Sequence, residues 1–184
     1  MNYKILQVAI VIPARKKSTR FPNKPLAQIL GKSMIERVWT QCIKALPKEN
    51  VYVATDSNDI NLFCTSLGIK TIMTSEKCQT GTDRVNEAAK KLKQNIIINV
   101  QGDEPLVSPE DIKKVIRFAI KNPNEIFNAM CPIDNEEDYR SLSVPKVIFS
   151  KSNQLLYMSR APIPHNKLGT FKKAWRQVCI YSFP

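Results

Sequence analysis

The residues of this chain best suited to chemistry lie in a basic segment near its start. Within ten residues the segment holds five cations and two hydroxyls, namely Arg15, Lys16, Lys17, Ser18, Thr19, Arg20 and Lys24. It directly follows the apolar run Val8–Ile12, which predicts a strand buried on both faces. Cationic side chains at this position suit a polyphosphate, because α/β proteins bind ligands outside the carboxyl ends of their strands. A solvated basic loop without a ligand is the alternative interpretation.

A second candidate for chemistry is the acidic turn formed by residues 102–105. It ends Ile96–Val100, the most strand-like run in the chain. A carboxylate at the end of a strand, beside phosphates, is the usual arrangement for Mg²⁺, which takes one or two carboxylates plus substrate oxygens. An aspartate after a glycine is also common in ordinary turns. These residues alone leave a metal role and a turn role for Asp103 equally open.

Histidine and cysteine show no comparable pattern. His165 is the single histidine, and we expect it to be a loop residue rather than a base. The five cysteines lack a Cys-x-x-Cys pair and are Cys42, Cys64, Cys78, Cys131 and Cys179. Zinc sites and a Ser-His-Asp triad are therefore unsupported. Three cysteines (Cys42, Cys64 and Cys179) occupy apolar positions, which favours buried free thiols in a reducing cytoplasm over disulfides.

The charge of the chain predicts an acidic ligand or partner. Its 184 residues carry a formal net charge of +12, with 43% hydrophobic and 24% charged residues. This length suits one domain, or one with a small appendage, and allows a substantial core. Charge alone leaves nucleic acid, an anionic membrane surface and a nucleoside triphosphate open. No signal peptide precedes the first strand and no apolar run approaches a membrane span, so we expect a cytoplasmic protein.

Strands and helices alternate along most of the chain. We expect strands at Val8–Ile12, Val51–Thr55, Ile69–Met73 and Ile96–Val100. Helices are expected after the N-caps or turns at Ser33, Ser57, Gly81 and Ser108, and Glu36 completes a capping box with Ser33. Short connections in this alternation imply right-handed βαβ units, a mostly parallel sheet and helices on both faces. Pro13 is expected to end the first strand, because proline cannot donate to the next rung of a ladder.

The pattern changes after about Asn128. Lys146–Ser150 and Gln154–Ser159 predict a hairpin, and Arg176–Phe183 predicts a further strand. Between them, Ala161–Trp175 contains two prolines, one glycine and three lysines, and we expect a mobile loop.

Several segments, in this order, carry a resemblance to a known family. They are IPARKKSTRFPNKPL, VATD, TGTDR, NVQGDEP, YMSRAPIP and CIYSF. Together they resemble the sugar-activating cytidylyltransferases, and among these the 3-deoxy-manno-octulosonate (Kdo) cytidylyltransferases. The resemblance implies a Rossmann-like α/β nucleotidyltransferase fold (GT-A-like) with a mixed, mostly parallel sheet. It also implies transfer of CMP from CTP to the anomeric hydroxyl of Kdo, for lipopolysaccharide biosynthesis, with Mg²⁺ as the cofactor.

The resemblance assigns roles to individual residues. For catalysis it implies Arg15, Lys24 and Asp103, with Asp103 also the Mg²⁺ ligand. For nucleotide binding it implies Pro13, Ala14, Arg15, Ser18, Arg20, Lys24, Thr80, Gly81 and Arg84. For sugar binding it implies Gln101, Arg160, Gln177 and Tyr181. It further implies a homodimer of a single domain, with residues 1–127 binding nucleotide and 128–184 binding sugar and the partner subunit, and no nucleic acid or membrane insertion.

The chain departs from the family's pattern at several positions. Asn23 replaces a usual glycine, and asparagine tolerates the left-handed region better than most residues. Gln177 and Cys78 stand where histidine is common, and a glutamine can hydrogen-bond but cannot titrate. An 8-amino-Kdo or a sialic-type acid therefore stays open as the sugar. Family members continue for some tens of residues beyond Pro184, so we expect a missing C-terminal segment, with an inactive nucleotide-binding chain as one alternative.

A basic nucleic-acid-binding module is the rival from another functional class. It would account for the net charge of +12. It would not account for the segment Gln101–Pro105, and no helix-turn-helix or stacking-aromatic pattern stands out.

Overall fold

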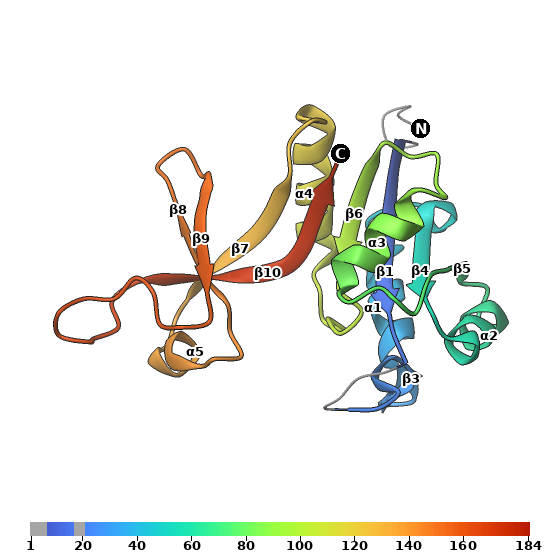
Figure 1. The fold of residues 1–184 in the computed structure, drawn as a ribbon, viewed down its shortest axis with the longest axis horizontal. Helices are drawn as coiled ribbons and strands as arrows, with labels where there is room; N and C mark the ends of the chain where they lie inside the picture. The colour runs from blue at the N-terminus through green and yellow to red at the C-terminus, as the bar shows by residue number, and fades with distance from the viewer. Residues whose placement is uncertain (1–6, 17–20) are drawn as a thin grey trace. The chain divides into compact units, whose positions relative to one another are not determined.

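The computed structural model describes residues 7–16 and 21–184. The chain divides into two compact units, shown in Figure 1. The first contains the chain up to Phe127 together with Cys179–Pro184, and the second is Asn128–Val178. The final residues of the chain therefore belong with the first unit, although the intervening segment does not.

The first unit is built on a mixed, mostly parallel sheet. Its strands are β1 (Val8–Ala14), β4 (Val51–Thr55), β5 (Lys70–Met73) and β6 (Ile96–Val100), in the order β5-β4-β1-β6 with parallel pairing. The end of β10 (Ala174–Phe183) adds an antiparallel strand beside β6, with Ile180 opposite Val100 and Phe183 opposite Ile97. The predicted α/β class and sheet type are confirmed.

Helices cover both faces of this sheet (Figure 1). On one face, Val85 and Ala88 of α3 (Gly81–Ala89) pack on Ala9, Val11 and Ile97 of the strands. On the other lie α1 (Met34–Cys42) and α4 (Pro109–Lys121), which contact each other, with α1 against β1 and α4 against β6. Helix α2 (Asn58–Ser66) packs on β4 and β5. Because helices bury both faces of the sheet, the sequences of its parallel strands are unbroken apolar runs.

Strand β1 continues through Pro13 to Ala14, so the expectation that this proline ends the strand was wrong. Pairing with β6 stops at Val11 opposite Asn99, whereas pairing with β4 extends to Ala14 opposite Thr55. Beyond Val11 the strand therefore has a paired neighbour on one side only. A strand tolerates proline at such a position, because no rung on the open side is lost.

The segment after the basic loop consists of short elements. They are the 3-10 helix η2 (Lys24–Leu26), the two-residue strands β2 (Gln28–Ile29) and β3 (Lys32–Ser33), and, after α1, the 3-10 helix η3 (Lys48–Asn50). Asn23 precedes η2 with φ 57° and ψ 24°, which confirms the left-handed conformation expected of it. Ser33 caps α1 by accepting the backbone N–H of Glu36, and Gly68 follows α2 with φ 70°, both as predicted.

The second unit contains the predicted hairpin. This unit comprises most of β7 (Phe127–Ile133), α5 (Glu136–Arg140), β8 (Lys146–Phe149), β9 (Leu155–Ser159) and the first half of β10. The hairpin is formed by β8 and β9. Strands β8 and β9 pair antiparallel, with Lys146 opposite Ser159, and Arg176 of β10 lies opposite Lys146. A small core forms from Ile133, Tyr139 and Ala174.

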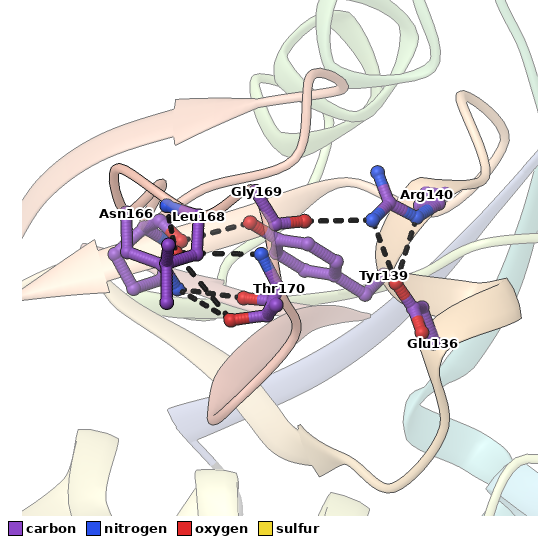
Figure 2. A network of polar contacts seen from close by, with 8 residues as sticks. Glu136, Tyr139, Arg140, Asn166, Leu168, Gly169 and Thr170 are labelled. Carbon is purple, nitrogen blue, oxygen red and sulfur yellow. Dashed lines mark hydrogen bonds and ion pairs between the residues drawn. The ribbon is translucent and has the colours of Figure 1, made fainter.

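The stretch between β9 and β10 has no helix or strand over Ala161–Lys173, yet polar contacts hold it in place (Figure 2). The Asn166 Oδ1 atom accepts the backbone N–H groups of Leu168 and Thr170, which closes the loop on itself. Arg140 donates to the Gly169 carbonyl at 2.7 Å, and its other bonds join it to Glu136 on α5. The loop is thus attached to α5, and the expected loop extended too far, since Ala174 and Trp175 belong to β10.

In the described part of the chain, no disulfide joins any of the five cysteines. Cys42 and Cys64 are buried as predicted, whereas Cys179 is only half-buried. In the part of the chain that the structure describes, no helix combines the length and the apolar character needed to span a bilayer.

Candidate active site

A pocket lies at the carboxyl edge of the first unit's sheet. Its walls come from the end of β1, the 3-10 helix η2, the start of α3 and the turn after β6. The lining residues are Pro13, Ala14, Arg15, Lys24, Pro25, Gly81, Arg84, Gln101, Gly102 and Asp103. Among them are one carboxylate, Asp103, and three cations, Arg15, Lys24 and Arg84. This balance of charge suits an anionic ligand that arrives with a cation of its own.

The two groups expected to bind opposite charges contact each other in this pocket. The Lys24 Nζ atom lies 2.7 Å from the Asp103 Oδ2 atom, although 79 positions separate the residues in the chain. Their side chains are 38% and 50% exposed, so both groups can reach solvent or a ligand. The fold has therefore placed the basic segment against the acidic turn.

Glycine allows the acidic turn to approach β1 this closely. A Cβ atom at residue 102 would lie 2.5 Å from the carbonyl oxygen of Pro13, a backbone atom that cannot give way. At Gly81, a Cβ would lie 3.2 Å from the Gln101 side chain and 3.3 Å from Pro13. The absence of side chains at these two positions lets α3, β1 and the turn meet at one point.

Arg84, one of the lining residues, forms a buried ion pair. Its guanidinium donates to the Asp56 carboxylate at 2.7 Å and to the Thr74 hydroxyl. Only 2% of the Arg84 side chain is exposed, against 13% for Asp56. The charge of Arg84 is thus already balanced by the protein, which distinguishes it from the other two cations. Arg15 is exposed, and its Nη1 atom donates to the carbonyl of Gln79 at the long distance of 3.4 Å.

The start of α3 is organised by its own side chains. The Thr80 hydroxyl accepts the backbone N–H of Asp83, and the Asp83 carboxylate accepts the backbone N–H of Thr80, a complete capping box. The Thr80 hydroxyl also donates to the Asp83 carboxylate at 2.8 Å, and this bond, followed by the one from the Thr80 N–H, lowers the pKa of Asp83. Glu87 accepts from the Cys78 thiol and the Ser75 N–H, and these bonds lower its pKa. The loop before α3 is consequently fixed at both ends.

The Gln101 side chain is hydrogen-bonded to a buried asparagine. Its Nε2 atom donates to the Oδ1 atom of Asn99 at 3.4 Å, and Asn99 is completely buried in β6. Among the described residues, the Asn99 Nδ2 atom has no hydrogen-bond partner. The contact between these two residues orients the Gln101 amide at the pocket wall.

Comparison with known proteins decides the family. The cytidylyltransferase family model matches residues 9–183 of this chain. The chain belongs to the cytidylyltransferase family. A 3-deoxy-manno-octulosonate cytidylyltransferase of Francisella philomiragia is 39% identical over 189 residues, covering 97% of this chain and 75% of the relative. A mitochondrial enzyme of the same name from Arabidopsis thaliana is 41% identical over 165 residues, covering 89% and 57%.

Solved structures agree with this assignment. The structure of a CMP:2-keto-3-deoxy-manno-octonic acid synthetase complexed with CTP superposes with a TM-score of 0.87 at 33% identity, over 96% of this chain and 73% of that one. A cytidylyltransferase from Leptospira borgpetersenii superposes with a TM-score of 0.59 at 23% identity, over 66% and 53%, which supports the fold alone. The predicted nucleotidyltransferase fold and family are confirmed.

The other predicted sugar-binding residues of this cytidylyltransferase are not among those that line the pocket. Arg160 and Gln177 belong to the second unit, where the Arg160 Nη1 atom donates to the carbonyls of Leu142 and Ser143. Tyr181 lies in the first unit on β10, opposite Asn99 of β6. Ser18 and Arg20 lie outside the described residues.

Sequence reasoning did not identify several residues that shape this cytidylyltransferase pocket. Asp56 has no role in the expectations above beyond its place in the segment VATD, yet it neutralises Arg84. Its position directly after β4, level with the turn after β6, was an available signal, because parallel strands end at the same edge. Asn99, a polar residue in an otherwise apolar strand, was another such signal.

Proposed function

We propose that this cytidylyltransferase transfers CMP from CTP to the anomeric hydroxyl of Kdo and releases pyrophosphate. The observation that carries the proposal is the pocket at the carboxyl edge of the sheet, which Arg15 lines together with the ion pair of Lys24 and Asp103. Relatives named as Kdo cytidylyltransferases, at 39% and 41% identity, support the same assignment. So does the similarity to a synthetase complexed with CTP.

In the proposed reaction the sugar hydroxyl attacks the α-phosphorus of CTP, and the bond to pyrophosphate breaks. Negative charge moves onto the leaving pyrophosphate, so catalysis depends on positioning and on cations that stabilise this charge. Arg15 offers a planar guanidinium for phosphate oxygens, and Lys24 a compact ammonium. Arg84, already paired with Asp56, holds the wall of the pocket rather than supplying free charge.

We propose Mg²⁺ as the cofactor, held by Asp103. No group of three or more His, Cys, Asp or Glu residues able to hold a metal occurs within residues 7–16 and 21–184. The half-exposed carboxylate of Asp103 nevertheless fits Mg²⁺, which needs only one or two carboxylates when substrate oxygens complete its coordination. Such an ion, when bound, would supply positive charge beside the phosphates. One carboxylate favours a metal that arrives with the nucleotide over a permanently bound one.

For the sugar we propose Gln101, Arg160, Gln177 and Tyr181 as binding residues. Arg160 is the group best suited to the carboxylate of a 2-keto acid, because a guanidinium matches carboxylate geometry. Its Nη1 atom is fixed on two backbone carbonyls at 2.8 and 3.2 Å. Its orientation is therefore set before a ligand binds. The product CMP-Kdo would serve lipopolysaccharide assembly, and we propose the cytoplasm as the site of synthesis.

We further propose that the chain forms a homodimer through β9. Four consecutive residues of this strand, Leu155, Leu156, Tyr157 and Met158, are 50%, 63%, 62% and 38% exposed. An exposed apolar strand favours association with another protein surface. Replacing Leu156 with Lys should then yield monomers in sedimentation velocity, whereas Leu62→Lys, at a residue of similar exposure on α2, should not. Equal sedimentation of both variants and the original chain would exclude β9 as the interface.

A panel of nucleotides and sugars tests the proposed reaction. CTP, ATP, GTP and UTP are each incubated with Mg²⁺ and either Kdo, 8-amino-Kdo or a sialic acid, and pyrophosphate is measured. We expect release only with CTP and a Kdo-type sugar. Equal turnover of all nucleotides would exclude the cytidylyl assignment. Release with a sialic acid and none with Kdo would exclude the sugar.

A further inference from the structure

The Lys24–Asp103 ion pair joins the two groups to which the proposed function gives opposite ligands. Lys24 is proposed to bind phosphate oxygens and Asp103 a divalent cation, but in the structure they bind each other at 2.7 Å. Neither group can serve its ligand fully while this contact lasts. The pair must therefore open when the pocket fills.

The backbone fixes both ends of the pair. Lys24 begins η2, directly after the left-handed Asn23, and the N–H of Ala27 returns to the Lys24 carbonyl at 3.1 Å. Pro25 of the same short helix is buried. Asp103 follows Gly102, which is packed against the Pro13 carbonyl. The two side chains meet because their backbones are held facing each other.

The Lys24–Asp103 ion pair is also exposed enough for a ligand to replace either partner. Exposed ion pairs contribute little net stability, and these side chains are 38% and 50% exposed. The buried pair of Arg84 and Asp56 in the same pocket, at 2% and 13%, has no such freedom. The pocket thus combines one fixed ion pair with one that a ligand can open at small cost.

We propose that the Lys24–Asp103 pair makes the pocket selective for a metal–triphosphate complex over either component alone. A metal-free triphosphate would engage Lys24 and leave the Asp103 carboxylate beside phosphate charge. A divalent cation alone would engage Asp103 and leave the Lys24 ammonium beside a cation. The complex replaces both halves of the pair at once. This inference rests on the proposed function, because it takes the ligands of both groups from it.

Binding of Mn²⁺ without nucleotide tests one half of the proposal. Free Mn²⁺ is measured by electron paramagnetic resonance in titrations of the original chain, Lys24→Met and Lys16→Met. We expect Lys24→Met to bind Mn²⁺ about three- to ten-fold more tightly, because the competing cation is gone. Lys16→Met is the matched control, since Lys16 pairs with Asp59 at similar exposures of 52% and 58% but does not line the pocket. Equal affinity of the original chain and Lys24→Met would overturn the proposal, as would equal tightening in Lys16→Met.

Binding of CTP in the presence of EDTA tests the other half. Asp103→Asn should bind metal-free CTP about three- to ten-fold more tightly than the original chain, because Lys24 is released and the carboxylate no longer repels phosphate. Addition of Mn²⁺ should raise the CTP affinity of this variant much less than it raises that of the original chain. Unchanged metal-free binding would overturn the proposal. The failure of the proposed function is distinguishable, because in that case the original chain would bind CTP with Mn²⁺ no better than ATP with Mn²⁺.

Discussion

Arg84, which lines the pocket, and Asp56 form an ion pair of 2.7 Å that is almost completely buried. Removing one partner of a buried pair leaves the other without compensation, which costs about 3–5 kcal/mol. We therefore expect Arg84→Met to lose about 3 kcal/mol in urea unfolding at pH 7. Lys113→Met, which removes an exposed pair with Glu110 on α4, should change stability by less than about 0.5 kcal/mol. An Arg84→Met variant of undiminished stability would show that the pair has no structural role.

Gly102→Ala should destabilise the protein and distort the pocket. The new Cβ atom would lie 2.5 Å from the Pro13 carbonyl oxygen, so the turn that holds Asp103 must shift. We expect a loss of about 1–3 kcal/mol in the free energy of unfolding, the range for overpacking, together with weaker CTP binding. Gly68→Asn is the control, because its φ is 70° with no atom within 4 Å, and asparagine tolerates that conformation. Equal effects of the two substitutions would contradict the close approach.

Alkaline pH should destabilise the protein through Cys64. Burial raises the pKa of its thiol from 9.0 to about 12. The folded chain therefore keeps a proton that the unfolded chain loses, so the stabilising contribution is complete below pH 9 and is lost as the pH rises toward 12. The loss should be about 1.4 kcal/mol per pH unit.

Urea unfolding of the original chain and of Cys64→Ala at a series of pH values checks this. The difference in stability between the two should be constant from about pH 6 to 8 and should shrink above about pH 9. A constant difference throughout would show that the folded thiol ionises normally.

Lys146 should be required for the integrity of the second unit. Its side chain is completely buried, and its Nζ atom donates to the carbonyls of Ser141, Val144 and Arg160 at 2.7–2.8 Å. Desolvation by burial lowers the pKa of this ammonium, yet three acceptors satisfy its three donors. Lys146→Met should cost about 2–3 kcal/mol, because buried carbonyls lose a charged partner.

Hydrogen exchange checks where that loss falls. In Lys146→Met, amide protection should decrease in β8, β9 and α5 while β1, β4 and β6 keep theirs, since the three acceptors of Lys146 all belong to the second unit. Lys151→Met, at an exposed turn residue, should leave both units unchanged. Loss of protection in the first unit's strands alone would contradict this assignment.

The sequence was informative where local pattern and final structure depend on the same forces. The apolar runs Val8–Ile12 and Ile96–Val100 predicted buried parallel strands. The prediction held because helices cover both faces of these strands, so that both faces must be apolar. The left-handed Asn23 and the cap at Ser33 followed from residue type alone. Arg15, Lys24 and Asp103, which were candidates because they follow these strands, line one pocket, although β1 runs to Ala14 rather than ending at Pro13.

Contacts between distant residues could not be predicted in this way. The expected role of Arg84 omitted Thr74 and Asp56, which lie 10 and 28 positions away from it in the chain. Pairing of Lys24 with Asp103 depends on how closely two loops approach, which Gly102 decides only in three dimensions. The extent of β1 beyond Pro13 likewise depended on which neighbour it pairs with there.

The most direct test of the account is identification of the product by mass spectrometry. The chain is incubated with CTP, Kdo and Mg²⁺, and with Asp103→Asn as the matched variant. We predict CMP-Kdo and one pyrophosphate per product from the original chain, none in EDTA, and a rate lower by about 10³-fold in Asp103→Asn, since a metal contributes several kcal/mol to transition-state stabilisation. Hydrolysis of CTP without a sugar nucleotide, or equal rates for the chain and Asp103→Asn, would contradict it.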